Sequence, residues 1–341
     1  MKNRFRTSAK ALFAVGPLRQ HLARAAFAAT ALLGAASACA QAYPSRPVVI
    51  INPFPGGATE IGARIYSQKL TESLGKPFVV DYKPGGGSVI ATNFVAKAPA
   101  DGHTLLISSA SFTISAATHP DLPYDPIKDI APISLTLIKP AMLMVHPSLP
   151  VNNFEEYIAY AKANPDKLNF GTTGAGGSYH LVGAWLHSLT NTQVTFAHYK
   201  GTSALFADQM AGRIHVSPSS IFNGLPHIKS GKLRAIIILS KERSSQLPGM
   251  KTVAEQGIPE FDYSSWEGMF TGGAVPRSIV ATLSSEFGKI AKMPDVIQKF
   301  SGTDGSLVVG STSEQFRQHV ATEIGRWRKI VKDNNIKAVD G

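Results

Sequence analysis

Short β-branched apolar runs alternate with amphipathic stretches through most of the chain. Residues 48–51 form one such run, which suits a buried parallel strand and ends at a turn rich in Pro and Gly. After that turn, Tyr66, Leu70 and Leu74 recur at i, i+4 spacing and predict a helix that ends near Gly75. Further strands are predicted at 78–80 and 104–107, with a helix between them that reaches about residue 98.

The same alternation resumes near residue 142. Strands are predicted at 142–145, 169–170, 194–196, 214–216 and 235–239, and helices at 154–163, 178–189, 203–211, 276–292 and 313–332. Repeated strand–loop–helix order predicts an α/β fold with mainly parallel sheets. No linker marks a domain boundary, which allows a chain that crosses between two lobes more than once.

The first 42 residues differ from the rest of the chain. They carry six Lys or Arg residues and no acidic residue, followed by an apolar, alanine-rich run from 25 to 40. Two small-residue sites end the run, at Ala38-Cys39-Ala40 and Ala40-Gln41-Ala42. A basic segment, a short apolar core and such sites are typical of a secretory signal peptide, and the run is too short for a membrane span. We therefore expect residues 1–42 to be removed on export, with lipidation of Cys39 left open.

Removal of this segment changes the net charge and the cysteine content of the protein. The net charge of the 341-residue chain is +11, from 34 basic and 23 acidic residues, and it falls to +5 without the six leader cations. The single cysteine, Cys39, is also lost, so the mature chain has no thiol chemistry or disulfide. The remaining basic residues are dispersed, so we expect no nucleic-acid partner.

Glycine-bearing loops between a strand and a helix are the recurrent candidate sites. They occur at 53–59, 84–88, 174–178 and 200–203. Glycine lets a ligand approach the backbone closely, and a helix N-terminus offers unpaired N–H groups, so such loops can bind carboxylate or phosphate. Glycine is also common in βα turns simply to make the turn. Four such loops in one chain favour an anion site.

Known catalytic and nucleotide motifs do not fit. Residues 171–178 have the spacing of a phosphate-binding loop, but Gly177 stands where that loop needs Lys. A dinucleotide-binding glycine pattern from Gly174 fails at Tyr179. There is no G-x-S-x-G or H-E-x-x-H motif. His180 and His187 lie seven residues apart, and we interpret them as ordinary polar or packing residues and not as metal ligands. We expect no catalytic residue, no cofactor and no metal.

Several strings in a fixed order resemble one family. These are YPSRPVVIINPFPGGATE, KPGGGSVIATNFVAKAPADGHTLL, NFGTTGAGGSYHLVGAWL, FAHYKGTSALFADQMAGRIHV, LPHIKSGKLRAIIILS and SSWEGMF. Together they resemble the tripartite tricarboxylate transporter receptors, also called the Bug family, over essentially all of the chain after residue 42.

The resemblance implies a two-lobed periplasmic binding protein of type II, each lobe a mainly parallel sheet flanked by helices. Lobe 1 would comprise 43–141 and 256–341, and lobe 2 would comprise 142–255, with the chain crossing near 139–143 and returning near 249–263. The implied function is to capture a small organic acid in the periplasm, as a monomer, and deliver it to membrane permease subunits. The expected acids are mono- and dicarboxylates, and they include aromatic acids.

The resemblance also implies the ligand-binding residues. In lobe 1 they are Phe54, Pro55, Gly56, Gly57, Ala58, Thr59, Glu60, Ser109 and Ser111, and in lobe 2 they are Ala175, Gly176, Gly177, Ser178, His180, Tyr199, Lys200, Gly201, Thr202 and Ser219. Two positions depart from the family pattern, because Glu60 and Ser219 stand where Asp is usual. The loss of an acidic residue at Ser219 favours a plain carboxylate over an amino acid. An exported hydrolase and a sensor that signals through a partner remain the alternatives.

Overall fold

The computed structural model describes residues 43–55, 58–119 and 121–333, so the predicted signal peptide lies outside the described residues. The described residues from Arg46 onward form one compact unit. Its first elements are β1 (Val48–Asn52), α2 (Ala58–Leu74), β2 (Phe78–Tyr82), the short 3-10 turn η1 (Gly86–Ser88), α3 (Val89–Ala96), β3 (Thr104–Ser109) and α4 (Ser111–Thr118).

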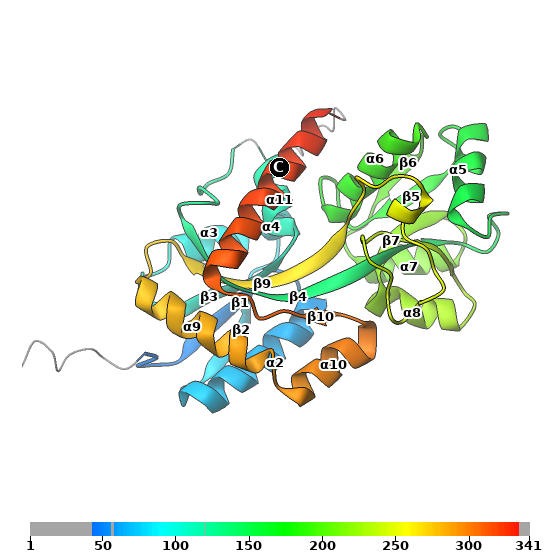
Figure 1. Cartoon of the computed structure of the whole chain (residues 1–341). Helices are drawn as coiled ribbons and strands as arrows, with labels where there is room; N and C mark the ends of the chain where they lie inside the picture. Colours follow the sequence, from blue (N-terminus) through cyan, green and yellow to red (C-terminus); the bar gives the residue numbers. More distant parts are fainter. Residues whose placement is uncertain (1–42, 56–57, 120, 334–341) are drawn as a thin grey trace, which may run out of the picture. The chain divides into compact units, whose positions relative to one another are not determined.

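Two long strands connect the two halves of the sheet. β4 (Ile130–Val145) pairs with β9 (Ser264–Gly272) as far as Pro140. From Ala141 onward it pairs with β7 (Val216–Ser220) and β8 (Arg234–Ile238). The partner of β4 thus changes after Pro140, and the chain rejoins the first half at Ser264 (Figure 1). The lobe boundaries at 141 and 255 remain predictions.

The second half contains strands β5 to β8 and helices α5 to α8. Its elements are α5 (Phe154–Ala163), β5 (Asn169–Thr172), α6 (Ser178–Thr190), β6 (Thr195–His198), α7 (Thr202–Met210), β7 (Val216–Ser220), α8 (Ile221–Lys229), β8 (Arg234–Ile238) and the short η2 (Ala254–Gln256). The chain closes with α9 (Arg277–Ile290), α10 (Pro294–Asp304), β10 (Leu307–Val308) and α11 (Ser313–Asp333).

The sheet order is β2-β1-β3-β9-β4-β7-β5-β6, with β8 and β10 also paired to β4. The strands of the predicted strand–helix units are parallel, as β1 is to both β2 and β3, and β5 to both β6 and β7. β4 and β9 run antiparallel to these neighbours. Each half is therefore a parallel group of strands joined to the other half through the antiparallel pair β4 and β9.

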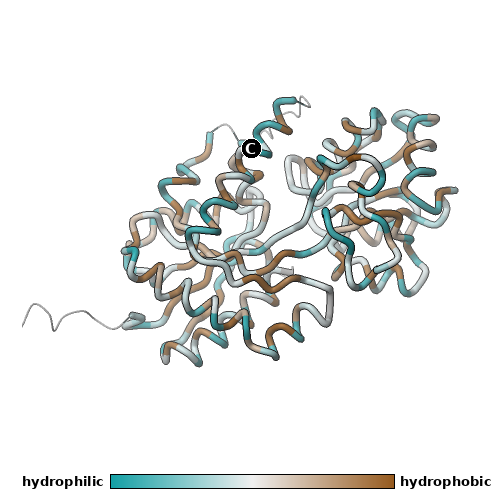
Figure 2. The backbone as a smooth tube through the Cα atoms, viewed as in Figure 1, coloured by the Kyte–Doolittle hydropathy of each residue, from teal (hydrophilic) through white to brown (hydrophobic). Residues whose placement is uncertain are grey.

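Helices cover both faces of each half. In the first half α2, α9 and α10 lie on one face, where Tyr66 packs on Phe287 and Phe300, and α3, α4 and α11 lie on the other (Figure 1). In the second half side-chain alternation along β4 divides the core. Leu143 belongs to the cluster with α5 and α6, and Met144 to the cluster with α7 and α8. Figure 2 shows the matching alternation of hydrophobic and hydrophilic segments along the helices.

Candidate functional site

The first loop starts from a buried asparagine. Asn52, the last residue of β1, accepts hydrogen bonds through Oδ1 from the Phe54 N–H (2.9 Å) and from the Thr59 hydroxyl (3.2 Å). The predicted residues Phe54 and Pro55 follow β1, Ala58 begins α2, and Gly56 and Gly57 lie outside the described residues. Asn52 thus joins both ends of the loop that leads into the N-terminus of α2.

Glu60 lies in the first turn of α2, where a negative charge is favourable. Its carboxylate forms an ion pair with Arg64 at 2.6 Å, one turn farther along the helix. Hydrogen bonding to Glu60, with Tyr82 nearby, raises the pKa of the Arg64 guanidinium. The Glu60 carboxylate is therefore already balanced by a cation.

The second loop has an unusual backbone. Gly86, Gly87 and Ser88 all have positive φ, at 57°, 59° and 89°, and Ser88 is the member with a side chain. Such a conformation is costly for a non-glycine residue, so the surroundings must fix it. The Ser115 hydroxyl donates to the Gly87 carbonyl (3.0 Å), and the Ser88 Oγ is buried without a hydrogen-bond partner in the described chain.

The third loop of this half contains Ser109 and Ser111. Ser109 ends β3, and its hydroxyl oxygen accepts from the Ser111 N–H at 3.3 Å. This turn starts α4. Because β2, β1 and β3 are parallel neighbours, the three loops lie at one edge of the sheet, outside the carboxyl ends of the strands. Ligands of open α/β folds usually bind at that edge.

In the second half, the loop after β5 contains Ala175, Gly176, Gly177 and Ser178. Gly176 has φ 66°, and its N–H donates to the Nδ1 of His180 (2.9 Å) in the first turn of α6. The Gly177 carbonyl in turn accepts from the N–H groups of His180 and Leu181. These hydrogen bonds therefore connect the loop to the first turn of α6.

The loop after β6 contains Tyr199, Lys200, Gly201 and Thr202. Gly201 precedes α7, and Lys200 is exposed. The Tyr199 hydroxyl donates to Asp208 (2.7 Å), and desolvation together with this carboxylate raises the pKa of Tyr199 to about 12. The phenol of Tyr199 thus points to α7. The space beside the Gly201 backbone is open, since an added Cβ would meet no other atom within 4 Å.

Ser219 lies in β7 and is buried, and its Oγ donates to the Ser220 carbonyl (2.8 Å). A Cβ on Gly224 of α8 would approach that Oγ to 3.1 Å, so the side chain faces α8. The next residue is bonded differently, since the Ser220 N–H donates to the Tyr179 hydroxyl (2.9 Å). The structure thus places Ser219 in the packing between β7 and α8.

Two residues near these loops were missed from the sequence. His198 ends β6, and its ring centroid lies 4.8 Å from that of His180. Thr172 ends β5, and its Oγ1 lies 2.6 Å from the His198 Nδ1. Only the parallel register of β5 and β6, which pairs Thr172 with His198, brings these side chains together. Spacing along the chain gives no such signal.

His187 is separate from this cluster. It is buried, with Nε2 bonded to the Tyr157 hydroxyl (3.1 Å) and Nδ1 to the Thr192 hydroxyl (2.6 Å). Both ring nitrogens form hydrogen bonds inside the core, in agreement with the interpretation of His187 as a polar or packing residue. Within the described residues, no group of three His, Cys, Asp or Glu side chains could hold a metal ion.

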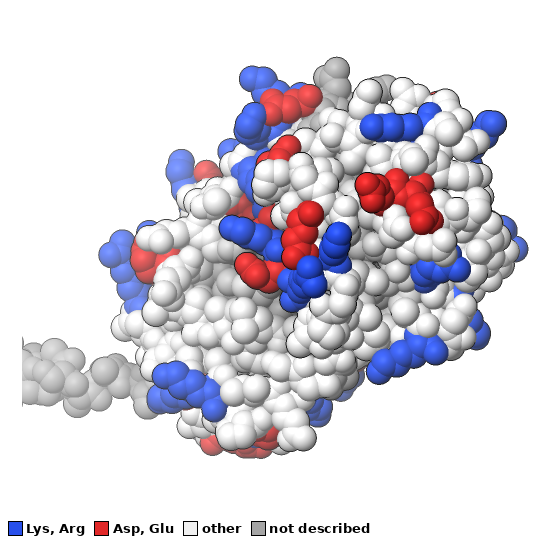
Figure 3. All heavy atoms as spheres, turned by 45° about the vertical axis from the view of Figure 1, so that its right-hand side comes forward, with Lys and Arg blue, Asp and Glu red and all other residues white. Residues whose placement is uncertain are grey.

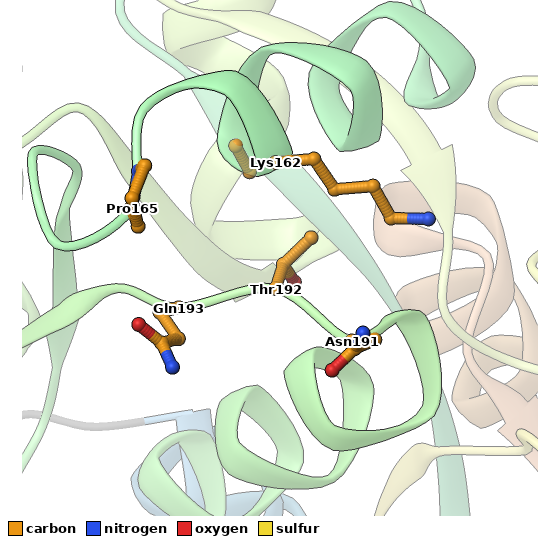
Figure 4. A pocket seen from close by; sticks show the side chains of 6 residues that line it. Lys162, Pro165, Asn191, Thr192 and Gln193 are labelled. Carbon is orange, nitrogen blue, oxygen red and sulfur yellow. The ribbon is translucent and has the colours of Figure 1, made fainter.

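A cavity of about 390 Å³ lies elsewhere in this half (Figure 4). It is lined by Ala161, Lys162, Pro165, Asn191, Thr192 and Gln193. These residues lie between the end of α5 and the segment that follows α6, before β5 and β6 begin. The cavity is thus at the amino ends of the strands, and it contains none of the predicted site residues.

The surface and the helices give two further observations. On the face shown in Figure 3, cationic and anionic side chains are intermixed and no continuous basic stripe crosses it. In the described part of the chain, no helix combines the length and the apolar character needed to span a membrane.

Comparison with known proteins places these observations in a family. Residues 62–336 match the model of the tripartite tricarboxylate transporter family receptors. The protein BugT of Bordetella pertussis is 34% identical over 314 residues, which cover 91% of this chain and 96% of BugT. Two solved structures are similar throughout. The R. palustris protein Rpa4515 with adipate has a TM-score of 0.81 at 29% identity, covering 87% of this chain and 100% of that one. MatC from Rhodopseudomonas palustris with bound malate has a TM-score of 0.77 at 28% identity, covering 85% and 100%.

Proposed function

This chain belongs to the tripartite tricarboxylate transporter receptor family, also called the Bug family, and on that premise we propose that it captures a small organic carboxylate between two lobes. The observation that carries the proposal is the position of the glycine loops. They lie at the carboxyl ends of the parallel strands in both halves, and each leads into a helix. Backbone N–H groups at such helix starts bind carboxylates well.

Ligand capture by closure follows from this arrangement. A ligand that contacts the loops of both halves stabilises the closed state, because only that state provides both sets of contacts. β4 and β9 connect the two halves and would act as the hinge. The similar structures that hold adipate and malate support a dicarboxylate as ligand.

The cellular role is part of the same proposal. We infer that residues 1–42 direct export, that the mature protein acts as a monomer in the periplasm, and that it delivers its ligand to membrane permease subunits without changing it chemically. The family name and the leader sequence support this inference.

The test is a thermal-shift screen of the mature protein with mono-, di- and tricarboxylates and aromatic acids. A ligand at 100 times its Kd should raise the apparent stability by about 2.7 kcal/mol. If no acid stabilises the protein, the proposed function is wrong.

A matched pair of variants tests the loop at α7. A Cβ on Gly201 or on Gly249 would meet no other atom within 4 Å, so Gly201→Val and Gly249→Val should both fold. Gly201→Val adds bulk at the N-terminus of α7 and should weaken ligand binding by about tenfold or more, the effect of one lost charge-assisted hydrogen bond. Gly249→Val should bind normally. Equal affinity of the two variants would exclude the α7 N-terminus from the site.

A further inference from the structure

His180 and His198 lie side by side at the edge of the sheet where the glycine-bearing loops follow β5 and β6. His198 ends β6, and His180 follows the loop that leaves the neighbouring parallel strand β5. Their ring planes meet at 74° with centroids 4.8 Å apart. Phe196 packs edge-on against His180 at 4.7 Å and fixes the orientation of that ring. The His198 side chain is exposed, so a ligand can reach the pair.

The hydrogen bond to His180 determines which of its nitrogens carries a proton. The Gly176 N–H donates to Nδ1, and a backbone N–H can only donate. Nδ1 must therefore keep its lone pair, and the neutral ring carries its proton on Nε2. Burial, with a smaller contribution from His198, lowers the pKa of His180 to about 4. His180 is thus a neutral side chain with a fixed Nε2–H donor.

His198 differs because its Nδ1 faces a hydroxyl group. The Thr172 Oγ1 lies 2.6 Å from that nitrogen and 3.3 Å from the Gly174 carbonyl oxygen. When His198 is neutral, the hydroxyl can donate to Nδ1. When His198 is protonated, the hydroxyl can accept from Nδ1–H and donate to Gly174 instead. Thr172 can therefore satisfy either protonation state, whereas Gly176 permits only the neutral state of His180.

No carboxylate of the described chain accompanies the pair. Burial lowers the pKa of His198, and the pKa of His180 depends on burial and on His198, with no other charged group acting on either ring. The elements packed against the rings contribute Phe196 from β6, Thr172 from β5 and the Gly176 backbone. The hydrogen bonds of both side chains use Nδ1, which leaves both Nε2 atoms available to an anion from outside the chain.

Resting on the proposed receptor function, we propose that His180 and His198 together bind the distal carboxylate of a dicarboxylate ligand through their Nε2–H groups, and that His198 takes up a proton from solvent as this carboxylate enters. A nearby anion favours the charged form of an imidazole. The proton adds to whichever His198 nitrogen is bare, so that Nδ1–H then donates to Thr172 and Nε2–H to the ligand. His180 remains neutral and supplies the second donor.

The experiment is isothermal titration calorimetry on the mature protein at pH 6.5, repeated in two buffers of different ionisation enthalpy. The difference in observed enthalpy gives the number of protons taken up on binding. The probes are succinate, glutarate, adipate and malate, each of the first three with the monocarboxylate of equal chain length, as hexanoate is to adipate. We expect a dicarboxylate to bind most tightly and with net proton uptake.

Variants assign that proton. Gln keeps an amide donor near the position of Nε2 but cannot titrate, so His198→Gln should abolish proton uptake and weaken dicarboxylate binding about tenfold, with little effect on a monocarboxylate. Thr172→Val should reduce the uptake by removing the acceptor for Nδ1–H. The matched control is His215→Gln, because His215 also accepts a backbone N–H, from Asn169 at 2.9 Å, but at the amino end of β5. It should leave both measurements unchanged.

The outcomes separate this inference from the receptor function. Tight dicarboxylate binding without proton uptake, or uptake that persists in His198→Gln, would overturn the role of the histidine pair. Monocarboxylates that bind as tightly as their dicarboxylate partners would also overturn it, and the receptor function would stand. If no acid binds, the receptor function itself fails.

Discussion

Replacement of Glu267 by Gln should destabilise the protein strongly, because it removes the negative charge that faces a buried cation. Glu267 on β9 is fully buried, and its Oε2 lies 2.8 Å from the Nζ of Lys139 on the adjacent strand β4. The Lys139 side chain is only 7% exposed. The pair lies just before the point, after Pro140, where β4 leaves its pairing with β9. The change keeps the shape of the side chain and removes only its charge.

The expected loss is about 3–5 kcal/mol of unfolding free energy, the usual cost of breaking a buried ion pair from one side. Removal of both charges in Glu267→Gln/Lys139→Met should recover most of that loss, since the buried cation is removed together with its counter-charge. An exposed pair provides the control. Arg243 and Glu255 have side chains 44% and 41% exposed, so Arg243→Gln should cost about 1 kcal/mol or less.

The assay is equilibrium urea unfolding of the three variants and the wild type, followed by circular dichroism, with unfolding free energies taken from linear extrapolation. If Glu267→Gln costs no more than Arg243→Gln, the burial argument is wrong. If the double variant is as unstable as Glu267→Gln, the loss comes from packing and not from the broken ion pair.

Further stability predictions concern a helical glycine and a buried histidine. A Cβ on Gly62 would come within 1.9 Å of the Glu267 Oε1, so Gly62→Ala should destabilise the protein in urea unfolding, whereas Gly325→Ala in α11, which meets no atom within 4 Å, should stabilise it by up to about 1 kcal/mol. Equal effects would refute the close contact. Burial lowers the pKa of His187 to about 3, so as the pH falls below about 6.5 the unfolded chain takes up this proton first and stability decreases. His187→Gln should remove about 1.3 kcal/mol per pH unit of that decrease between pH 5.5 and 4.5, and an unchanged pH profile would show that His187 is not its source.

The strand–helix units could be predicted from hydrophobic spacing, but the connecting strands could not. The predicted helix at 154–163 coincides with α5, because its apolar face and Asn153 cap are local signals. β4 was recognised only at 142–145, since Pro132 and Pro140 interrupt its pattern and its register shifts twice against β9. No strand was predicted at 264–272, where β9 lies.

Some features of the candidate site could likewise be predicted from local sequence, and others could not. The positions of the glycine-rich loops predicted where helices begin. α6 starts at Ser178 and α7 starts at Thr202, each directly after such a loop. The family resemblance pointed to Ser219, which the structure buries against α8. His198 was missed, because its meeting with His180 depends on the pairing of β5 with β6. Local pattern thus predicts where a backbone can bind an anion, and tertiary register decides which side chains join it.

Direct identification of the bound species tests the central claim. The mature protein would be incubated with the carboxylate panel, examined by native mass spectrometry, and then denatured so that the released ligand can be identified. The receptor account predicts one organic acid bound per chain and recovered with its mass unchanged. A chemically altered product, or a protein that binds no acid from the panel, would contradict it.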